Sequence, residues 1–297
     1  MSAPGPTVLS VVVDPVRLSA GIVDENGDVL VRDRISTPSR EVWRVLEQLI
    51  GRVLAAASDD VAAPETVGVS TTTPFDQTAG SVSPHLIPAW TAFPLRGHLE
   101  DLTGLPVVLD SAAAALAEGE RWLGAARQID SSLTLIVDTT VESACIVAGR
   151  RLRGAKGNAG SIAHTVVDPG GPPCWCGGTG CLAVLASATD LEKEMNRPLR
   201  RATDTIIDRT GILLGRAIAS TLAIVDVSTV FITGSVVDTF GDPLVEAIHR
   251  EVMLRSRLTH LGDFSLVELT DPVQPLVAAA ALVPALQPTA GATPRSG

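Results

Sequence analysis

Four potential metal ligands lie close together in the middle of this chain. Cys174, Cys176 and Cys181 fall within eight residues of a glycine-rich segment, and His164 lies ten residues before the first of them. Thiolate sulfur and imidazole nitrogen are the ligands that structural zinc takes, four at a time and in tetrahedral geometry. Because the protein fills all four positions, the pattern predicts a structural Zn²⁺ and not a catalytic one.

A disulfide and a set of free thiols are the alternatives to a metal site. Disulfide frameworks are typical of small secreted domains, whereas this chain has 297 residues, four cysteines and no recognisable signal peptide. The metal site is therefore favoured, with free thiols or a partial site as the remaining alternative. Cys145 lies in an apolar run, residues 143–147, where we expect a buried thiol that binds no metal.

Composition and charge narrow the range of partners. Apolar residues make up 45% of the chain, which is ample for a sizeable core. The net charge of −10 repels phosphate backbones, and no stripe of Lys and Arg offsets it, so we expect no direct nucleic-acid partner. The apolar runs are broken well before the roughly 20 residues that span a bilayer, so we expect no membrane partner and a cytoplasmic location.

The elements that must position these residues follow a pattern that occurs twice. Apolar runs at 8–13, 18–24 and 29–35 predict an antiparallel three-strand meander, with Asn26-Gly27 at the second turn. A helical pattern over 39–54 and a strand at 66–70 follow, and a crossover helix implies that this strand is parallel to the first.

The second half of the chain repeats this order. Strands are predicted at 133–137 and 143–147, a turn at Gly149-Arg150, a long helix over 203–224 and a strand at 230–233. Two copies indicate two lobes with a cleft between them, where ligands commonly bind. We expect a loose leader (1–7), an N-terminal lobe (8–122), a C-terminal lobe (123–285) with the zinc-binding loop (164–181), and a disordered tail (286–297).

Several motifs together resemble one known family. Residues 153–155 (Arg-Gly-Ala), 159–164 (Ala-Gly-Ser-Ile-Ala-His) and the CxCGGxGC run ending at Cys181 resemble the ROK family of repressors and sugar kinases, as do segments 82–84, 104–108, 114–118 and 215–230. The resemblance implies an α/β chain with an actin-like ATPase fold of the ribonuclease H-like type, in which each lobe holds a mixed sheet flanked by helices. It also implies a homodimer.

The resemblance suggests one catalytic residue. Family members that phosphorylate sugars use an aspartate, within an Asn-Asp pair, as general base on the sugar hydroxyl, and an alignment through Leu116-Ala117-Glu118 places Asp110 on it. The preceding asparagine is Leu109 in this chain, and the following one is Ala112. A lone aspartate at a strand end is also typical of a turn or a helix cap, so the catalytic role of Asp110 is one of two interpretations.

The phosphate-binding loops depart from the family pattern. The first, Asp-x-Gly-Gly-Thr-like in relatives, is replaced by residues 12–17, with either Val12 or Asp14 at the aspartate position. The second, a glycine-rich run, is replaced by residues 138–144, which bring in Asp138 and Glu142. Nucleotide, if bound, should contact Thr139, Thr140, Gly234 and Ser235, and we expect ATP and Mg²⁺ as cofactors only if the chain is an active kinase.

The residues expected around a sugar are altered too. Ser161 and Ala183 stand where the family has glutamates, and His85 stands where it has an asparagine. The resemblance places a sugar-like ligand against His85, Asp110, Asn158 and His164. Deleting buried polar groups that bind hydroxyls should remove most of the affinity for an ordinary hexose.

Two functional classes are favoured by these observations, and a third is less so. The first is a degenerate ROK protein, a pseudokinase that acts through a ligand or a partner, and the second is an ATP-dependent sugar kinase with Asp110 as its base. The third is a transcriptional regulator acting through a partner. Regulators of this family carry a helix-turn-helix ahead of the first strand, whereas seven residues precede Val8 here.

Overall fold

The first lobe is built on a sheet that begins with the expected meander. The computed structural model describes residues 5–58, 60–256 and 263–286. Strands β1 (Thr7–Val13), β2 (Arg17–Asp24) and β3 (Val29–Ser36) are antiparallel neighbours. The β2–β3 turn contains Gly27 at φ 85°, where a left-handed backbone favours glycine. The meander predicted from the sequence is confirmed.

Two parallel strands complete this sheet. Helix α1 (Val42–Ala55) leads to β4 (Thr66–Thr71), which pairs in parallel with β1 as predicted, and β7 (Val107–Ser111) pairs in parallel with β4. The strand order is therefore β3-β2-β1-β4-β7. Helix α1 begins at Val42 with Glu41 as its N-terminal cap, so Ser39 lies outside the helix. A two-stranded hairpin, β5 (Phe75–Asp76) and β6 (Ser81–Val82), follows β4.

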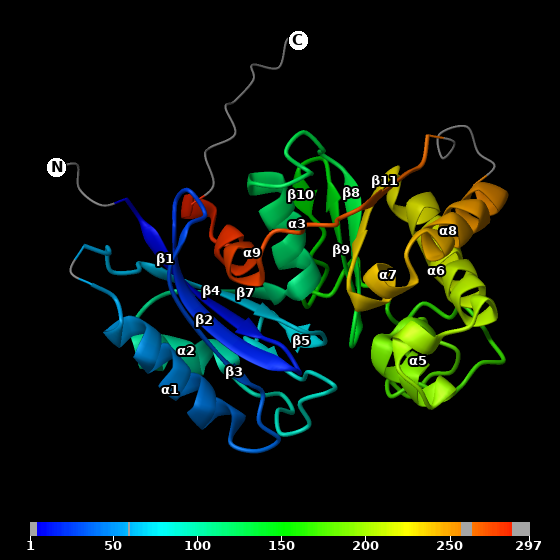
Figure 1. Ribbon diagram of the computed structural model, residues 1–297. Coiled ribbons are helices and arrows are strands. Elements are labelled where there is room, and N and C mark those ends of the chain that lie inside the picture. Colours follow the sequence, from blue (N-terminus) through cyan, green and yellow to red (C-terminus); the bar gives the residue numbers. More distant parts are fainter. Residues whose placement is uncertain (1–4, 59, 257–262, 287–297) are drawn as a thin grey trace, which may run out of the picture.

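Helices cover both faces of the first sheet. On one face, α1 and α2 (Leu95–Thr103) share an apolar core with the strands. On the other, α3 (Ala112–Trp122) packs beside α9 (Pro275–Ala281), which returns from the end of the chain (Figure 1). A Cβ on Gly68 of β4 would lie 2.2 Å from the carbonyl oxygen of Ala279, so glycine permits this close approach. Residues 275–281, expected in the C-terminal lobe, thus pack on the N-terminal one.

The second sheet repeats the arrangement. Strands β8 (Ser132–Val137), β9 (Val141–Val147), β10 (Arg150–Arg151), β11 (Thr229–Thr233) and β12 (Ser265–Glu268) lie in the order β10-β9-β8-β11-β12. The last two pair in parallel with their neighbours, and β8 to β10 form a second meander. Two five-stranded mixed sheets flanked by helices confirm the predicted two-lobe α/β architecture.

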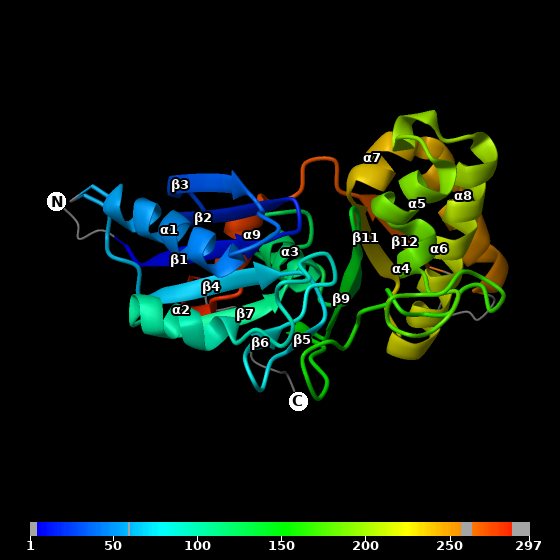
Figure 2. The same ribbon diagram turned by 90° about the horizontal axis from the view of Figure 1, so that it is seen from below.

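Helices of the second lobe gather at its outer end (Figure 2). They comprise α4 (Ala183–Ala186), α5 (Ala188–Met195), α6 (Asp204–Val225), α7 (Ser235–Phe240) and α8 (Asp242–Arg255), with a 3₁₀ turn at Leu199–Arg201. A second 3₁₀ turn, Pro284–Leu286, follows α9 and packs on the first sheet. Helices α6 and α8 pack side by side over an apolar core that includes Leu214, Ile218 and Ile248. Among the described helices, none combines the length and the apolar character needed to cross a membrane.

Some boundaries differ from those expected. Strand β9 begins at Val141, two residues before the predicted start, so the second phosphate loop is reduced to a short turn at residues 138–140. Arg150, predicted in a turn, is the first residue of β10. Thr7 already belongs to β1, and residues 287–297 of the predicted tail lie outside the described residues.

Candidate functional site

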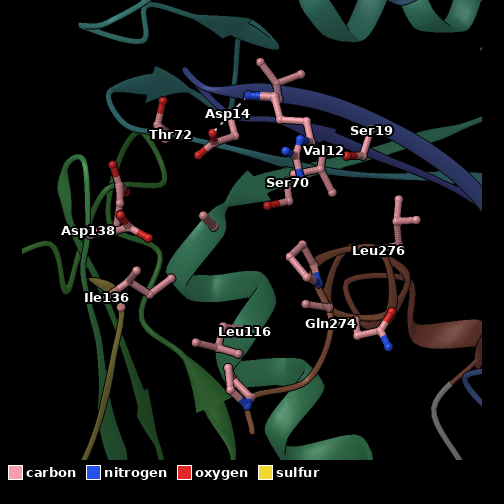
Figure 3. Close-up of a pocket in the computed structure, with 18 of the residues that line it drawn as sticks. Val12, Asp14, Ser19, Ser70, Thr72, Leu116, Ile136, Asp138, Gln274 and Leu276 are labelled. Carbon is pink, nitrogen blue, oxygen red and sulfur yellow. Dashed lines mark hydrogen bonds between the residues drawn. The ribbon is translucent and has the colours of Figure 1, made fainter. Parts of the chain in front are cut away.

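A cleft of about 890 Å³ lies between the lobes. It is lined by the ends of β1, β4 and β8, by the first turns of α3 and α7, and by the segment that leads into α9 (Figure 3). In a mixed sheet flanked by helices, the ends of parallel strands are where ligands usually bind. The cleft is therefore the candidate site, and its lining decides what it can hold.

The four residues predicted to bind nucleotide do come together in this cleft. Thr139, Thr140, Gly234 and Ser235 all line it. Gly234 has φ 115°, and a Cβ there would lie 2.5 Å from the carbonyl oxygen of Val137, so glycine is needed for α7 to start this close to β8. The backbone thus retains a tight strand-to-helix turn where a nucleotide was expected.

The Asp138 carboxylate accepts hydrogen bonds from polar groups at this turn. Its Oδ1 accepts hydrogen bonds from the Thr139 backbone N–H (2.8 Å) and from the Ser235 hydroxyl (2.6 Å). Backbone amides and hydroxyls at such a turn are the groups that receive phosphate in nucleotide sites. Here these groups already donate their hydrogen bonds to the Asp138 carboxylate, whose negative charge would repel a phosphate.

Glu142 adds a second carboxyl group, which is buried between the lobes. Its side chain comes from β9, and the residue is 3% exposed. Oε1 accepts hydrogen bonds from the backbone N–H and the hydroxyl of Thr73, both at 3.0 Å, whereas Oε2 has no partner among the described residues. Burial raises the pKa of Glu142 to about 7, opposed by the Thr73 hydrogen bonds and reinforced by the charge of Asp14.

Val12 and Asp14 are the two candidates for the aspartate position of the first loop, and Asp14 is the one that places a carboxylate in the cleft. Both residues line it, but Val12 belongs to β1 and contributes an apolar surface. Asp14 lies in the β1–β2 turn, where its Oδ1 accepts hydrogen bonds from the N–H groups of Val16 (2.8 Å) and Arg17 (3.3 Å). Burial raises the pKa of Asp14, and the nearby charge of Asp138 raises it further.

The predicted base, Asp110, lies at the end of β7 but not in the cleft lining as the structure describes it. Its side chain is 1% exposed and pairs with Arg151 of β10, and Arg153 Nη1 lies 3.8 Å from its other carboxylate oxygen. Burial raises the pKa of Asp110 to about 6 even though Arg151 lowers it. The first residue of α3, Ala112, lines the cleft instead and carries no titratable group.

The Asn158 side chain makes hydrogen bonds with the backbone of Phe75. Its side-chain oxygen accepts from the Phe75 backbone N–H at 3.3 Å, and its amide donates to the Phe75 carbonyl at 2.7 Å. The side chain therefore holds the β5 hairpin against the C-terminal lobe. With these bonds made, the contact expected between Asn158 and a sugar has little support from the geometry.

The four proposed metal ligands converge as the sequence suggested. His164 Nδ1 lies 3.6 Å from Cys174 Sγ, Cys176 Sγ lies 3.7 Å from Cys181 Sγ, and all four ligand atoms lie within 4.8 Å of one another. Two sulfur atoms on a tetrahedral zinc ion are about 3.8 Å apart, given Zn–S bonds of about 2.3 Å. The donor set and its spacing therefore fit a tetrahedral metal ion. Cys145 is fully buried and lies outside this cluster.

Trp175, between two of these cysteines, links the cluster to the N-terminal lobe. Its ring stacks on His85 with centroids 4.4 Å apart and planes 8° from parallel, and it contacts His164 edge-on at 4.5 Å. His85 and Trp175 line a smaller cavity of about 50 Å³, to which Thr139, Thr140 and Glu142 also contribute. His85 and His164, both expected against a sugar, thus lie on either side of one tryptophan.

Three residues of the site escaped the sequence analysis. Arg151 lies in no sequence motif that indicates a buried ion pair. Thr72, which lines the cleft, belongs to none of the segments that resemble the family. Trp175 had a signal, because a large side chain between two metal ligands must point away from the ion. Its contact with His85, ninety residues earlier, is a tertiary feature that the spacing does not reveal.

Comparison with known proteins gives a consistent result. The model of the ROK family matches residues 15–283. A glucokinase from Thermotoga maritima is 32% identical over 196 residues, a match that covers 64% of this chain and only 60% of that enzyme's length. An N-acetylmannosamine kinase from Shigella boydii is 28% identical over 247 residues, covering 77% of this chain and 83% of the other.

A solved structure agrees over almost the whole length. The crystal structure of a ROK hexokinase from Thermus thermophilus superposes with a TM-score of 0.79 at 28% identity, covering 94% of this chain and 98% of that one. The two-lobe fold is therefore shared with this hexokinase.

The buried carboxyl of Glu142 should make stability depend on pH. Its pKa rises from 4.5 to about 7 on folding, so the folded protein keeps a proton that the unfolded chain has lost. The free energy of unfolding therefore falls between pH 4.5 and about 7 and levels off above. Asp110, with its pKa raised to about 6, contributes at lower pH, so the last part of the fall reports mainly on Glu142.

We expect Glu142→Gln to flatten this part of the profile and to raise the free energy of unfolding near about pH 8 by up to about 3 kcal/mol. Denaturant unfolding at a series of pH values measures both effects. Glu47→Gln, on the exposed side of α1, is the matched control because it removes a carboxylate from the surface. A Glu142→Gln profile that runs parallel to the wild-type profile throughout would contradict this account.

Proposed function

We propose that this chain, which belongs to the ROK family, is a sugar-kinase-like protein that binds a small sugar-like ligand in its cleft without efficient phosphoryl transfer. The observation that carries the proposal is the Asp138 carboxylate, which takes up the Thr139 N–H and the Ser235 hydroxyl at the phosphate end of the cleft. The names of its relatives, a glucokinase, an N-acetylmannosamine kinase and a hexokinase, support the sugar-like ligand.

Phosphoryl transfer depends on positioning and on stabilisation of negative charge. Asp138 and Glu142 place carboxyl groups in the same cleft, and two like charges 4 Å apart repel by about 4 kcal/mol at an effective dielectric constant of 20. Arg17, Arg32 and Arg34 also line the cleft, but they belong to β2 and β3 in the other lobe. The phosphate end itself is therefore unfavourable for a triphosphate.

The base required for transfer is also poorly placed. A general base must come within hydrogen-bond distance of the hydroxyl that it deprotonates. Asp110 is held by Arg151 outside the cleft lining, and Ala112, which faces the cleft, has no proton-accepting group. These two positions support the pseudokinase interpretation over the active kinase.

The remaining parts of the proposal concern the metal and the assembly. We propose that His164, Cys174, Cys176 and Cys181 bind a structural Zn²⁺, since the four ligand atoms form a compact set of the right chemistry. Such an ion would fix the loop that carries Trp175. A cytoplasmic homodimer that binds no nucleic acid directly completes the proposal, and light scattering tests the dimer.

The nucleotide part of the proposal is tested by calorimetry. We expect ATP with Mg²⁺ to give no measurable heat of binding to the wild-type protein. Asp138→Asn, which keeps a hydrogen-bond acceptor but removes the charge, should give a measurable heat of ATP binding, a gain in affinity of at least about tenfold, equivalent to about 1.4 kcal/mol. Asp238→Asn is the matched control, because Asp238 also lines the cleft but accepts no hydrogen bond from Thr139 or Ser235.

The kinase alternative has its own decisive result. Turnover of ATP with any member of a panel of sugars and amino sugars, lost in an Asp110→Asn variant that remains folded, would overturn the proposal. Absence of turnover in both proteins supports it.

The metal part is tested by removal. We expect about one equivalent of Zn²⁺ per chain, released by a chelator together with a marked fall in melting temperature, because metal binding is coupled to folding. Cys176→Ser should lose the metal and melt at a similarly low temperature, whereas Cys145→Ala should retain it, since Cys145 lies outside the cluster. Identical melting of metal-loaded and chelated protein would refute the structural role.

A further inference from the structure

We propose that the cleft binds the ammonium group of a small organic ligand through Glu142 of the C-terminal lobe and Thr72 and Asp14 of the N-terminal lobe. This inference rests on the ligand-binding function proposed above and names the chemical class of its ligand, a primary amine such as an amino sugar. The ROK resemblance does not require such a site, because Glu142 lies in the segment, residues 138–144, that replaces a glycine-rich run of the family.

Two buried polar atoms in the cleft lack hydrogen-bond partners. Glu142 and Thr72 are 3% and 4% exposed, and both line the cleft. Within the described residues, neither Glu142 Oε2 nor Thr72 Oγ1 has a partner. An unsatisfied buried polar atom costs about 1–3 kcal/mol, so a ligand that supplies the missing bonds regains that free energy.

The chemistry of these atoms restricts the ligand. A hydroxyl can donate or accept, but the ionised form of Glu142, which predominates above its pKa of about 7, only accepts, so a ligand that pairs with this form must bring a hydrogen-bond donor. Thr73 already supplies two donors to Oε1, which fixes the carboxyl plane and leaves Oε2 for the ligand. A primary ammonium group offers three donors and can serve several acceptors at once.

The acidic side chains near these atoms favour a cation, whereas Arg17, Arg32 and Arg34 line the cleft from β2 and β3. Asp14, Thr72 and Asp138 all line this part of the cleft (Figure 3), and the charge of Asp138 acts on Asp14. Asp14 and Glu142 interact unfavourably with each other, and Asp14 also with Asp138, whereas no cation is among the groups that shift the pKa of Glu142. Arg17 lowers the pKa of Asp14, but less than Asp138 raises it. A positive ligand group would relieve this repulsion, which a neutral hydroxyl would not.

The spacing favours an organic cation over a bare metal ion. Within the described part of the chain, the cluster of His164 and the three cysteines is the group that brings three or more ligand atoms within reach of one ion. The carboxylates of Asp14, Asp138 and Glu142 do not meet that spacing. A molecule with a cationic group and a neutral body of several atoms suits a cleft of about 890 Å³ better than an ion does.

Binding by the full-length protein at neutral pH tests the inference. Glucosamine is compared with glucose and N-acetylglucosamine, which share its ring but lack the charge, and ethanolamine is compared with ethylene glycol. Calorimetry and thermal shift should show each amine binding at least about tenfold more tightly than its neutral counterparts, one charge-assisted contact being worth about that factor.

Variants assign the effect to the floor of the cleft. Glu142→Gln keeps an oxygen for Thr73 but puts an amide donor at the position of Oε2, so it should abolish the preference for amines. Thr72→Val should weaken amine binding severalfold while leaving the ratio between neutral sugars unchanged. Glu47→Gln, a surface change on α1, should have no effect.

Each outcome separates the two proposals. If glucose and glucosamine bind equally, the ammonium inference is overturned and the sugar-binding function stands. If ethanolamine binds in a Glu142-dependent manner while all sugars fail, the ammonium site stands and the sugar-like ligand is wrong. If no amine shows binding that depends on Glu142, the inference fails whatever the sugars do.

Discussion

The ion pair between Asp110 and Arg151 joins the two lobes in their interior, beside the hydrogen bonds of Glu142 to Thr73 and of Asn158 to Phe75. Asp110 ends a strand of the first sheet and Arg151 belongs to the edge strand of the second, and both side chains are almost fully buried. Burial raises the pKa of Asp110 and lowers that of Arg151, so it favours the neutral form of each group. The attraction between the two charges opposes these shifts but is the smaller effect. The pair is therefore costly to bury and costly to break, since removing one partner of such a pair costs about 3–5 kcal/mol. Arg151 also donates to the Gly157 carbonyl at 2.8 Å, which extends the connection into the loop that precedes the metal cluster.

The interlobe cleft owes its character to side chains that replace glycines. A glycine-rich loop leaves backbone amides exposed for phosphate, because nothing projects from the chain. Asp138 and Glu142 project from the corresponding turn and strand, and each is satisfied differently. Asp138 bonds to its own turn and to the start of α7. Glu142 reaches across to Thr73 in the other lobe, and its other oxygen is buried without a partner among the described residues. Under the proposed function, these two side chains disfavour a phosphate and create the conditions for an amine.

Local features of this protein could be predicted from its sequence, and most long-range ones could not. The meander around Asn26-Gly27 and the convergence of Cys174, Cys176 and Cys181 depend on nearby residues, and the structure has both. The position of α9 on the first sheet depends on small residues far apart in the chain, such as Gly68 and Ala279, which no periodicity connects. The role suggested for Asp110 depended on an alignment through Leu116-Ala117-Glu118 and did not account for Arg151. Residues that act through a distant partner are the ones that sequence reasoning reached least well.

The metal cluster and the cleft are not independent parts of the molecule. Trp175 is flanked on both sides by cluster cysteines, so the path of the loop around the four ligand atoms sets the position of its ring. That ring stacks on His85, and both line a small cavity that Glu142 also lines. Glu142 lines the main cleft as well, so this residue is common to the two cavities. A change in the loop that moved Trp175 would alter the packing beside Glu142 without touching the cleft directly. Under the proposed function, the histidine and cysteines that first suggested a metal ion would therefore influence ligand binding through the position that their loop gives to Trp175.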